Sequence, residues 1–240
     1  MVLALTTIKN SSLMPTPSTY NLLLGIPVFQ GMGKTELQEI IAHTKLGFEK
    51  HEAGENLQTA GQRCNQLVFL MSGAIALTTK ADDESFAITE DIDTPYTIEP
   101  ERLFGIYNQC RTTVTTLTTC NIMTLDKEEV VKLLEQYTVF RFNLLNLIST
   151  QSQRMGNGRW KAEKTNLRNR LARFIETRCT IPKGTKHLRI MRKQLAVEMN
   201  MGFANMTKAL HQLQNEGLLR IRRGVYDIPR LEELSEEDKT

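Results

Sequence analysis

Residues 191–216 read MRKQLAVEMNMGFANMTKALHQLQNE, and this stretch decides the fold of the C-terminal part of the chain. Apolar residues recur at helical spacing on both sides of Asn200, which predicts two helices joined by a tight turn. The inward-facing residues are Leu195, Ala196 and Met199 in the first helix, and Met206, Ala209, Leu210 and Leu213 in the second. Small Ala196 allows two steeply crossed helices to approach closely, and Asn200 tolerates the positive φ that the turn needs.

A β-hairpin is predicted directly after these helices. Gly217 is placed to end the second helix, and residues 218–221 and 225–228 have strand character on either side of Arg222-Arg223-Gly224. Two helices, a tight turn and a hairpin together predict a winged helix-turn-helix domain over residues 165–231.

The outward residues at the start of the second helix are the candidates for contacts with bases in a DNA major groove. Lys208 matches guanine O6 and N7, and Asn205 matches adenine or a phosphate. Basic residues at the start of the first helix and in the hairpin are candidates for phosphate contacts. The predicted DNA-binding residues are Arg192, Lys193, Gly202, Phe203, Ala204, Asn205, Thr207, Lys208, Arg222 and Arg223.

The charge distribution agrees with such an interface. The 240 residues carry a net charge of +3, but residues 1–150 carry −6, residues 151–231 carry +13 and residues 232–240 form an acidic tail at −4. A compact segment with this excess of Lys and Arg is typical of a protein that binds the phosphate backbone. A solvated basic surface, or one that binds anionic lipid or a protein partner, is the alternative.

The N-terminal half predicts strands. Residues 1–20 have no helical or strand period, and we expect a flexible leader there. A short helix is predicted from Lys34 to Thr44. Between Lys45 and Thr124, short segments rich in Thr, Val and aromatic residues alternate with turn residues at the spacing of a sandwich or barrel. We therefore expect an antiparallel β-roll within residues 21–136 and an α+β protein overall.

A long helix is predicted to link the two halves over residues 137–164, with a break near Tyr137-Thr138 and a bend at residues 156–158. Leu144, Ile148, Gln151 and Met155 follow one another at intervals of four, three and four residues. This spacing is typical of the seam of a two-stranded coiled coil and predicts a homodimer. The alternative is an amphipathic helix packed on its own domain.

Several classes of protein are disfavoured. Cys64, Cys110, Cys120 and Cys179 lie far apart, so we expect neither a metal site nor a disulfide. Gly33-Lys34-Thr35 lacks the remaining glycine of a phosphate-binding loop, and the chain contains no recognisable catalytic motif, so we expect no enzyme. No apolar run is long enough to cross a bilayer and no secretory signal is legible, so we expect a cytoplasmic protein without membrane contact.

Segments spread over residues 25–231 carry a resemblance to a known family. They are Ile26–Met32, Leu67–Gly73, Phe104-Gly105, Arg111-Thr112, Arg170–Phe174, Met191–Ala196 and Leu210–Leu218. Together they resemble the family of the cyclic AMP receptor protein and the fumarate and nitrate reduction regulator, the Crp/Fnr family. In this resemblance Phe104, Gly105, Arg111 and Thr112 correspond to the phosphate-binding cassette and are the candidate effector-binding residues.

The resemblance implies a bacterial, homodimeric transcription regulator. It implies a cyclic-nucleotide-binding-like jelly roll, a dimerisation helix and a winged helix-turn-helix, and a pseudo-palindromic site on double-stranded DNA as the target. RNA polymerase is the further partner that it implies. An effector in the β-roll would reorient the DNA-binding domains through the long helix.

The sequence departs from the family at two places. Ile106 follows Gly105 where members that bind cyclic nucleotides have Glu, and Arg111 comes only six residues after Gly105. A site that has lost the partner of a hydroxyl group loses much of its affinity, so we expect that cyclic AMP is not the effector, and we expect no cofactor. Gly202-Phe203-Ala204-Asn205 replaces the familiar Ser-Arg-Glu-Thr, which predicts a different DNA consensus. The alternative function is a small-molecule sensor with a degenerate DNA-binding domain.

Overall fold

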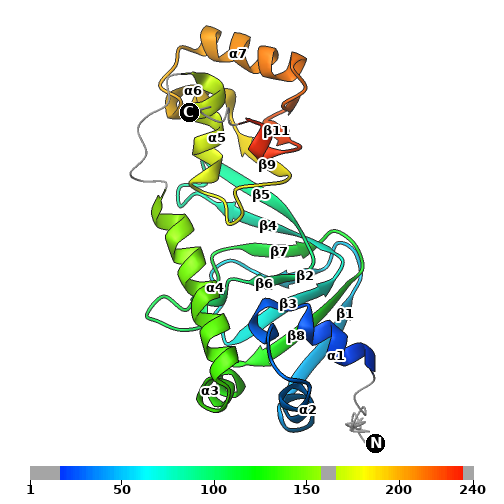
Figure 1. Ribbon diagram of the computed structural model, residues 1–240. Coiled ribbons are helices and arrows are strands. Elements are labelled where there is room, and N and C mark those ends of the chain that lie inside the picture. Colours follow the sequence, from blue (N-terminus) through cyan, green and yellow to red (C-terminus); the bar gives the residue numbers. More distant parts are fainter. Residues whose placement is uncertain (1–16, 158–165, 235–240) are drawn as a thin grey trace, which may run out of the picture.

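The computed structural model describes residues 17–157 and 166–234 of the chain (Figure 1). The first elements are α1 (Pro17–Leu24), η1 (Pro27–Phe29), α2 (Lys34–His43), β1 (Leu46–His51), β2 (Asn56–Gln58), β3 (Gln66–Ser72), β4 (Ala74–Lys80), β5 (Phe86–Asp93), β6 (Tyr96–Ile98), η2 (Pro100–Arg102), β7 (Thr113–Thr116) and β8 (Cys120–Asp126). After them come α3 (Lys127–Gln136), α4 (Thr138–Asn157), α5 (Leu167–Glu176), β9 (Lys186–Ile190), α6 (Arg192–Glu198), α7 (Phe203–Asn215), β10 (Arg220–Arg222), β11 (Val225–Ile228) and α8 (Leu231–Leu234). The predicted α+β fold is confirmed.

The β-roll consists of two antiparallel sheets. One has the strand order β1-β8-β3-β6, and the β-roll part of the other has the order β5-β4-β7-β2. Alternate residues of β4, Ile75 and Leu77, are fully buried, as the two-residue period of a strand requires. They share one apolar cluster with Leu70 of β3 and Ile122 of β8. The core of the roll therefore lies between the two sheets, and the predicted β-roll is confirmed.

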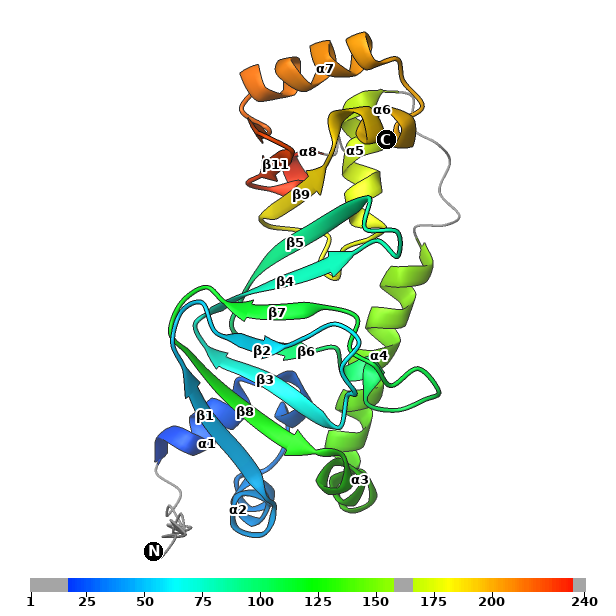
Figure 2. The same cartoon turned by 180° about the vertical axis from the view of Figure 1, so that it is seen from behind.

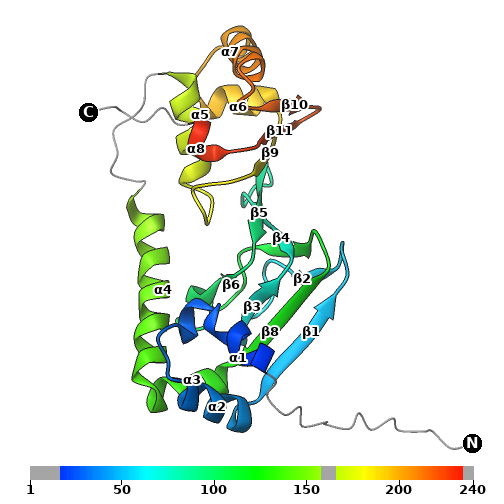
Figure 3. The same ribbon diagram turned by 45° about the vertical axis from the view of Figure 1, so that its right-hand side comes forward.

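Helices α1, α2 and α3 cover the end of the roll away from the C-terminal domain (Figure 3). Leu23, Leu37 and Val130 of these helices share one apolar cluster with Phe69 of β3. The ring centroid of Phe29 in η1 lies 6.2 Å from that of Phe69 and 5.4 Å from that of Phe140 in α4. We expected a flexible leader over residues 1–20, but Pro17–Tyr20 belong to α1, and the burial of Leu23 fixes that helix on the core. Residues 1–16 lie outside the described residues.

Helix α4 runs beside the β-roll toward the C-terminal domain (Figures 1 and 3). The break predicted near Tyr137 separates α3 from α4. Phe140 and Leu144 on its inner face are buried in the core. The side-chain amide of Asn143 donates to the carbonyl oxygens of Val28, at 3.2 Å, and Gln30, at 2.7 Å. The first half of α4 is therefore fixed to its own domain. The bend predicted at residues 156–158 extends beyond the described residues.

The C-terminal domain has the predicted order of helices and hairpin. Asn200 in the turn between α6 and α7 has φ of 45°, and Gly217 after α7 has φ of 76°. Leu231 and Leu234 of the short α8 are buried, and the Arg168 guanidinium donates to the Leu234 carbonyl oxygen at 3.1 Å. The packed domain thus continues to Leu234, into the stretch that we assigned to an acidic tail over residues 232–240. Residues 235–240 are not described.

The two halves share one sheet, which the sequence did not predict. Strand β9 pairs antiparallel with β5, in register from Phe86 opposite Ile190 to Glu90 opposite Lys186. The second sheet therefore has seven strands in the order β10-β11-β9-β5-β4-β7-β2. Figure 2 shows β5 at the edge of the roll beside β9. Through this pairing the hairpin of the helix-turn-helix domain is continuous with the β-roll.

Candidate nucleic-acid interface and effector cavity

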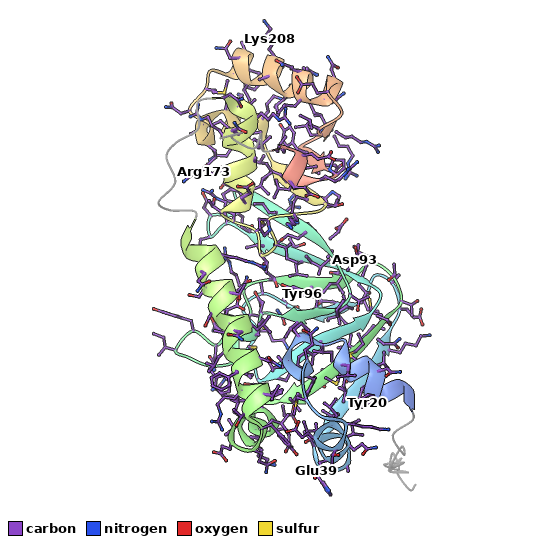
Figure 4. All side chains as sticks on the ribbon, in the orientation of Figure 1. Tyr20, Glu39, Asp93, Tyr96, Arg173 and Lys208 are labelled. Carbon is purple, nitrogen blue, oxygen red and sulfur yellow. The ribbon has the colours of Figure 1, made fainter. Side chains whose placement is uncertain are left out.

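Helix α7 presents a free outer face. Met206, Leu210 and Leu213 of this helix are buried against the domain, whereas Phe203 is 50% exposed and Lys208 is exposed. Lys208 lies on the outer side of α7, away from the β-roll (Figure 4). Backbone hydrogen bonds hold the turn between α6 and α7. In one of them the N–H of Met201 donates to the carbonyl oxygen of Ala196 at 2.9 Å. The inward and outward faces are those that the periodicity predicts.

The polar residues at the start of α7 differ in how freely they can contact DNA. Gly202, Ala204 and Asn205 are exposed together with Phe203 and Lys208. Thr207 is half-buried, and its hydroxyl donates to the Phe203 carbonyl oxygen at 2.9 Å. The Thr207 hydroxyl is therefore engaged with its own helix, which makes it a weaker candidate for a base contact than Asn205 or Lys208.

The four basic residues predicted for phosphate contacts lie at the start of α6 and in the hairpin. Lys193 and Arg223 are exposed, and Arg192 is half-buried. Arg222 is exposed, but its guanidinium lies 2.6 Å from the Asp227 carboxylate. The carboxylate neutralises part of the charge of Arg222, so the structure distinguishes Arg223 from Arg222 where the sequence treats them alike.

Charged groups line the boundary where β5 meets the C-terminal domain. Lys186 and Glu90 are buried, with Lys186 Nζ 3.6 Å from Glu90 Oε2. The Glu90 carboxylate also accepts hydrogen bonds from the backbone N–H groups of Thr180, at 2.6 Å, and Ile181, at 3.0 Å. Lys186 in turn donates to the Lys183 carbonyl oxygen. Both buried charges are therefore compensated, as burial of ionised groups demands.

His187 forms a second polar bridge across the same boundary. Its Nδ1 lies 2.6 Å from an oxygen of Asp227 in β11, and its Nε2 lies 3.1 Å from an oxygen of Asp91 in β5. Burial alone lowers the pKa of His187, but the hydrogen bonds with Asp227 and Asp91 outweigh it and raise the pKa above the usual value. The boundary therefore contains an imidazole whose two carboxylate partners favour its protonated form.

Arg178 adds an aromatic contact to this boundary. Its guanidinium carbon lies 4.0 Å from the ring centroid of Phe174 in α5 and 5.6 Å from that of Phe86 in β5. The two rings are themselves 5.1 Å apart. The sequence does not predict the contact of Phe86 with Arg178 and Phe174, because β5 and α5 are far apart in the chain.

The residues that resemble a phosphate-binding cassette are divided between two places. Gly105, with φ of 92°, lies in an exposed loop with Ile106 and Tyr107, which are 86% and 76% exposed. Phe104 is half-buried, and Lys127 Nζ lies 5.0 Å from its ring centroid. Arg111 instead lines a cavity of about 750 Å³ with Thr59, Gly61, Lys80 and Arg178. Phe104 and Gly105 are not among the residues that line that cavity.

Thr112 belongs to neither place. It is 1% exposed. Its backbone N–H and that of Arg111 both donate to the buried carboxylate of Glu99. The four predicted effector-binding residues therefore do not form one site in this structure.

A second cavity, of about 340 Å³, lies between α4 and the β6–η2 segment. Asn143, Asn146, Thr150, Gln151 and Arg154 line it from the side of α4. Tyr96, Thr97 and Pro100 line it from the roll. Thr97 is 4% exposed, and its hydroxyl has no hydrogen-bond partner among the described residues. An unpartnered buried hydroxyl beside a polar cavity favours a ligand that supplies the missing hydrogen bond.

Comparison with known families agrees with the fold of the β-roll. Residues 48–137 match the family model described as the cyclic nucleotide-binding domain. The N-terminal roll is therefore similar to cyclic nucleotide-binding domains over these residues. The matched segment runs from β1 to the end of α3 and includes both parts of the divided cassette.

Three solved structures are similar to the chain over most of its length. Catabolite activator protein of Thermus thermophilus shares 15% identity, with 87% of this chain and 96% of that chain covered and a TM-score of 0.46. CLP of Xanthomonas campestris, described as a global regulator responsive to c-di-GMP, shares 15% identity, with 82% of this chain and 99% of that chain covered and a TM-score of 0.47. DNR of Pseudomonas aeruginosa shares 14% identity, with 92% of this chain and 98% of that chain covered and a TM-score of 0.46. The search of curated proteins found no match. At these levels of similarity, a function has to be argued from the chain's own residues.

The residues predicted for the dimer seam lie against their own β-roll domain. Leu144 is 2% exposed, Ile148 packs on the same core, and Gln151 lines the cavity beside α4. The side chain of Met155 lies outside the described residues. Leu144 is therefore buried within the protomer and is not available to a second chain, whereas Ile148 and Gln151 are only half-buried. For these two residues the predicted seam stays a prediction.

The exposed apolar residues of α4 lie on another face of the helix. Phe142 is 59% exposed and Leu145 is 51% exposed. Ser149 and Ser152, which are also exposed, continue this face at intervals of four and three residues. The spacing is again that of a coiled-coil seam, so Phe142 and Leu145 are further candidates for a dimer contact.

Within the described residues, no group of three or more His, Cys, Asp or Glu side chains is arranged to hold a metal ion. Among the same residues, no helix is both long and apolar enough to span a membrane.

Proposed function

We propose that this chain is a homodimeric transcription regulator of the Crp/Fnr type that binds a pseudo-palindromic site on double-stranded DNA in the cytoplasm. The observation that carries the proposal is the exposed outer face of α7, which presents Asn205 and Lys208 on a domain with the basic hairpin residue Arg223 beside it. A helix with buried apolar residues behind and polar residues in front, flanked by cations, fits a major groove.

The charge of the domain supports the same proposal. Residues 151–231 carry +13 against −6 for residues 1–150. Contacts between Lys or Arg and phosphates release counterions, so this excess supplies affinity that depends strongly on salt. RNA polymerase is the proposed protein partner, by the family resemblance alone.

We place the effector in the cavity of about 340 Å³ between β6 and α4. The cavity is lined by Arg154, by amide side chains and by Thr97, whose buried hydroxyl has no partner among the described residues, and this set suits a small polar ligand with acceptor groups. Because the cavity touches both the roll and α4, an effector there can shift the helix that we assign to dimerisation. Cyclic AMP is not proposed, because Ile106 replaces the cassette carboxylate and is 86% exposed.

Strand pairing provides the proposed route from the effector domain to DNA. Strand β5 belongs to the roll and pairs with β9, which pairs with β11 of the hairpin. A displacement of β5 therefore moves the hairpin and α7 together with it.

The test is selection of binding sites from random duplex DNA, followed by affinity measurements over a range of salt concentrations. We expect a selected two-fold symmetric site that is bound more tightly than random DNA. Lys208→Ala is the informative variant. Lys132→Ala, which removes an exposed lysine of α3 that pairs with Glu129, is the matched control. Selection of no site, together with weak binding that Lys208→Ala leaves unchanged, contradicts the proposal.

The second candidate is the small-molecule sensor with a degenerate DNA-binding domain, and the cavity with its unpartnered Thr97 hydroxyl favours it. The same experiment separates the two functions. A sensor of this kind binds a small ligand. Its positive charge retains it only weakly on random duplex DNA or heparin, and the selection experiment returns no preferred DNA sequence.

A further inference from the structure

Glu99 is a buried carboxylate at the junction of β6 and η2. It is 5% exposed, although it precedes a turn close to the surface. Its carboxylate accepts hydrogen bonds from the backbone N–H of Arg111, at 3.1 Å to each oxygen, and from that of Thr112, at 3.1 Å. The side-chain amide of Gln58 donates to it at 2.8 Å. Two successive backbone N–H groups and one amide therefore converge on a single carboxylate.

Such a convergence of neutral donors is the usual chemistry of an anion site. Successive backbone N–H groups that point to one place bind phosphate, sulfate or carboxylate groups in many proteins. In this protein the anion is covalently part of the chain. The pKa of Glu99 is raised overall, because burial and the charge of Glu101 outweigh the hydrogen bonds from the Arg111 N–H and the Gln58 amide, which lower it.

The backbone of Glu99 is also unusual. Its φ is 41°, in the left-handed region that residues with a side chain rarely adopt. A non-glycine residue keeps this conformation only where its surroundings compensate the cost. The contacts of the Glu99 carboxylate with Gln58, Arg111 and Thr112 are such a compensation, because they require a side chain at this position that glycine lacks.

We propose that Glu99 is a built-in ligand that fills the anion site formed by the Arg111 and Thr112 backbone and the Gln58 amide, and so excludes phosphate and other small oxyanions from it. The consequence is that this part of the roll is complete without a phosphorylated effector. The proposal goes beyond the proposed function, because it makes no use of DNA binding and stands or falls independently of it.

The test removes the carboxylate and offers an anion in its place. Glu99→Gly deletes the side chain and suits the positive φ, since glycine adopts it freely. Glu84→Gly is the matched control, because Glu84 also has a positive φ, of 56°, but is exposed in the turn between β4 and β5. Inorganic phosphate is titrated into each protein by calorimetry, and the amide resonances of Arg111 and Thr112 are followed by NMR.

We expect Glu99→Gly to bind phosphate saturably and to show shifts at Arg111 and Thr112, and we expect neither in the wild type or in Glu84→Gly. A folded Glu99→Gly variant that binds no phosphate overturns the proposal. Binding of phosphate by the wild-type protein with shifts at the same two amides also overturns it.

A measurement on the wild-type protein keeps the proposal testable if Glu99→Gly does not fold. The amide protons of Arg111 and Thr112 should exchange with deuterium much more slowly than that of Ile106 in the exposed loop, without any ligand present. Exchange at the same rate as Ile106 would mean that the carboxylate does not hold these groups, and the proposal would be wrong.

Discussion

Lys186 and Glu90 form an ion pair that is shielded from water at the boundary between the roll and the helix-turn-helix domain, with 3.6 Å between Nζ and Oε2. One partner lies in β9 and the other in β5, opposite each other in the register of the shared sheet. A buried pair of this kind contributes little net stability compared with apolar residues of similar shape, but removal of one partner leaves an uncompensated charge. We therefore expect the pair to disfavour arrangements of the two domains that separate Lys186 from Glu90.

Lys186→Met is expected to destabilise the protein by about 3–5 kcal/mol, because the Glu90 carboxylate then stays buried without its cation. The double variant Lys186→Met, Glu90→Gln should recover much of that loss. Urea unfolding of the single and double variants measures both. Lys50→Met, in an exposed pair with Glu52, should leave the stability almost unchanged. If the loss of unfolding free energy in the double variant equals the sum of the losses in the two single variants, the two residues are not coupled.

His187 should make stability depend on pH. Its folded-state pKa is raised, so its contribution is fully present below the unfolded value of about 6.5 and is lost as pH rises through the folded-state pKa. The difference in urea midpoint between the wild type and His187→Gln should therefore shrink as pH increases. His211→Gln, a change in the exposed His of α7, is the control. A difference that grows with pH contradicts this assignment.

Lys208→Ala should relax the preference for one base pair of the selected site by about 1–3 kcal/mol, because a lysine in the major groove reads base edges. Competition binding with sites changed at one position at a time measures this. An equal loss on all sequences would show that Lys208 contacts only phosphate.

Arg223→Ala should weaken binding to all sequences alike and reduce the slope of log K against log salt by about 1, because it removes one phosphate contact. Arg222→Ala should change the slope less, since Asp227 already neutralises part of the Arg222 charge at 2.6 Å. Equal effects of the two variants would mean that the ion pair opens on DNA.

Phe142→Glu and Leu145→Glu should prevent the proposed homodimer from forming, because each places a charge on the exposed apolar face of α4. Sedimentation velocity gives the state of association. Val197→Glu, at an apolar residue of α6 that is 71% exposed, should remain dimeric. Leu144→Ala should instead cost about 2–5 kcal/mol of folding stability, since Leu144 is part of the core. Dissociation by Leu144→Ala without loss of stability would restore the original seam.

Cys110 and Cys179 should resist alkylation. Burial raises the pKa of the Cys110 thiol to about 12 and that of Cys179 to about 12. The thiolate is the reactive form, so reaction with iodoacetamide at a pH of about 8 should be roughly a thousandfold slower in the folded protein than in urea. Mass spectrometry of tryptic peptides measures the labelling. Rapid labelling of Cys110 in the native protein would contradict its burial.

Local periodicity determined the helix-turn-helix. Apolar residues at helical spacing over residues 191–216 define which face of each helix is inward, and Asn200 and Gly217 mark the turn and the helix end. These features depend on neighbours within a few residues, so the sequence alone is sufficient to predict them. The break at Tyr137 and the strands of the roll were predictable for the same reason.

Which surfaces meet became known from the packed fold. Helix α4 has two apolar stripes, and the sequence does not say that Leu144 packs on its own domain while Phe142 stays exposed. The pairing of β5 with β9 and the contact of Glu99 with Arg111 join residues that are distant in the chain. The residues of a strand determine which of its side chains face the core, but not which strand it pairs with. Pairing depends on which strand edge and which charged side chains lie next to it in the packed chain.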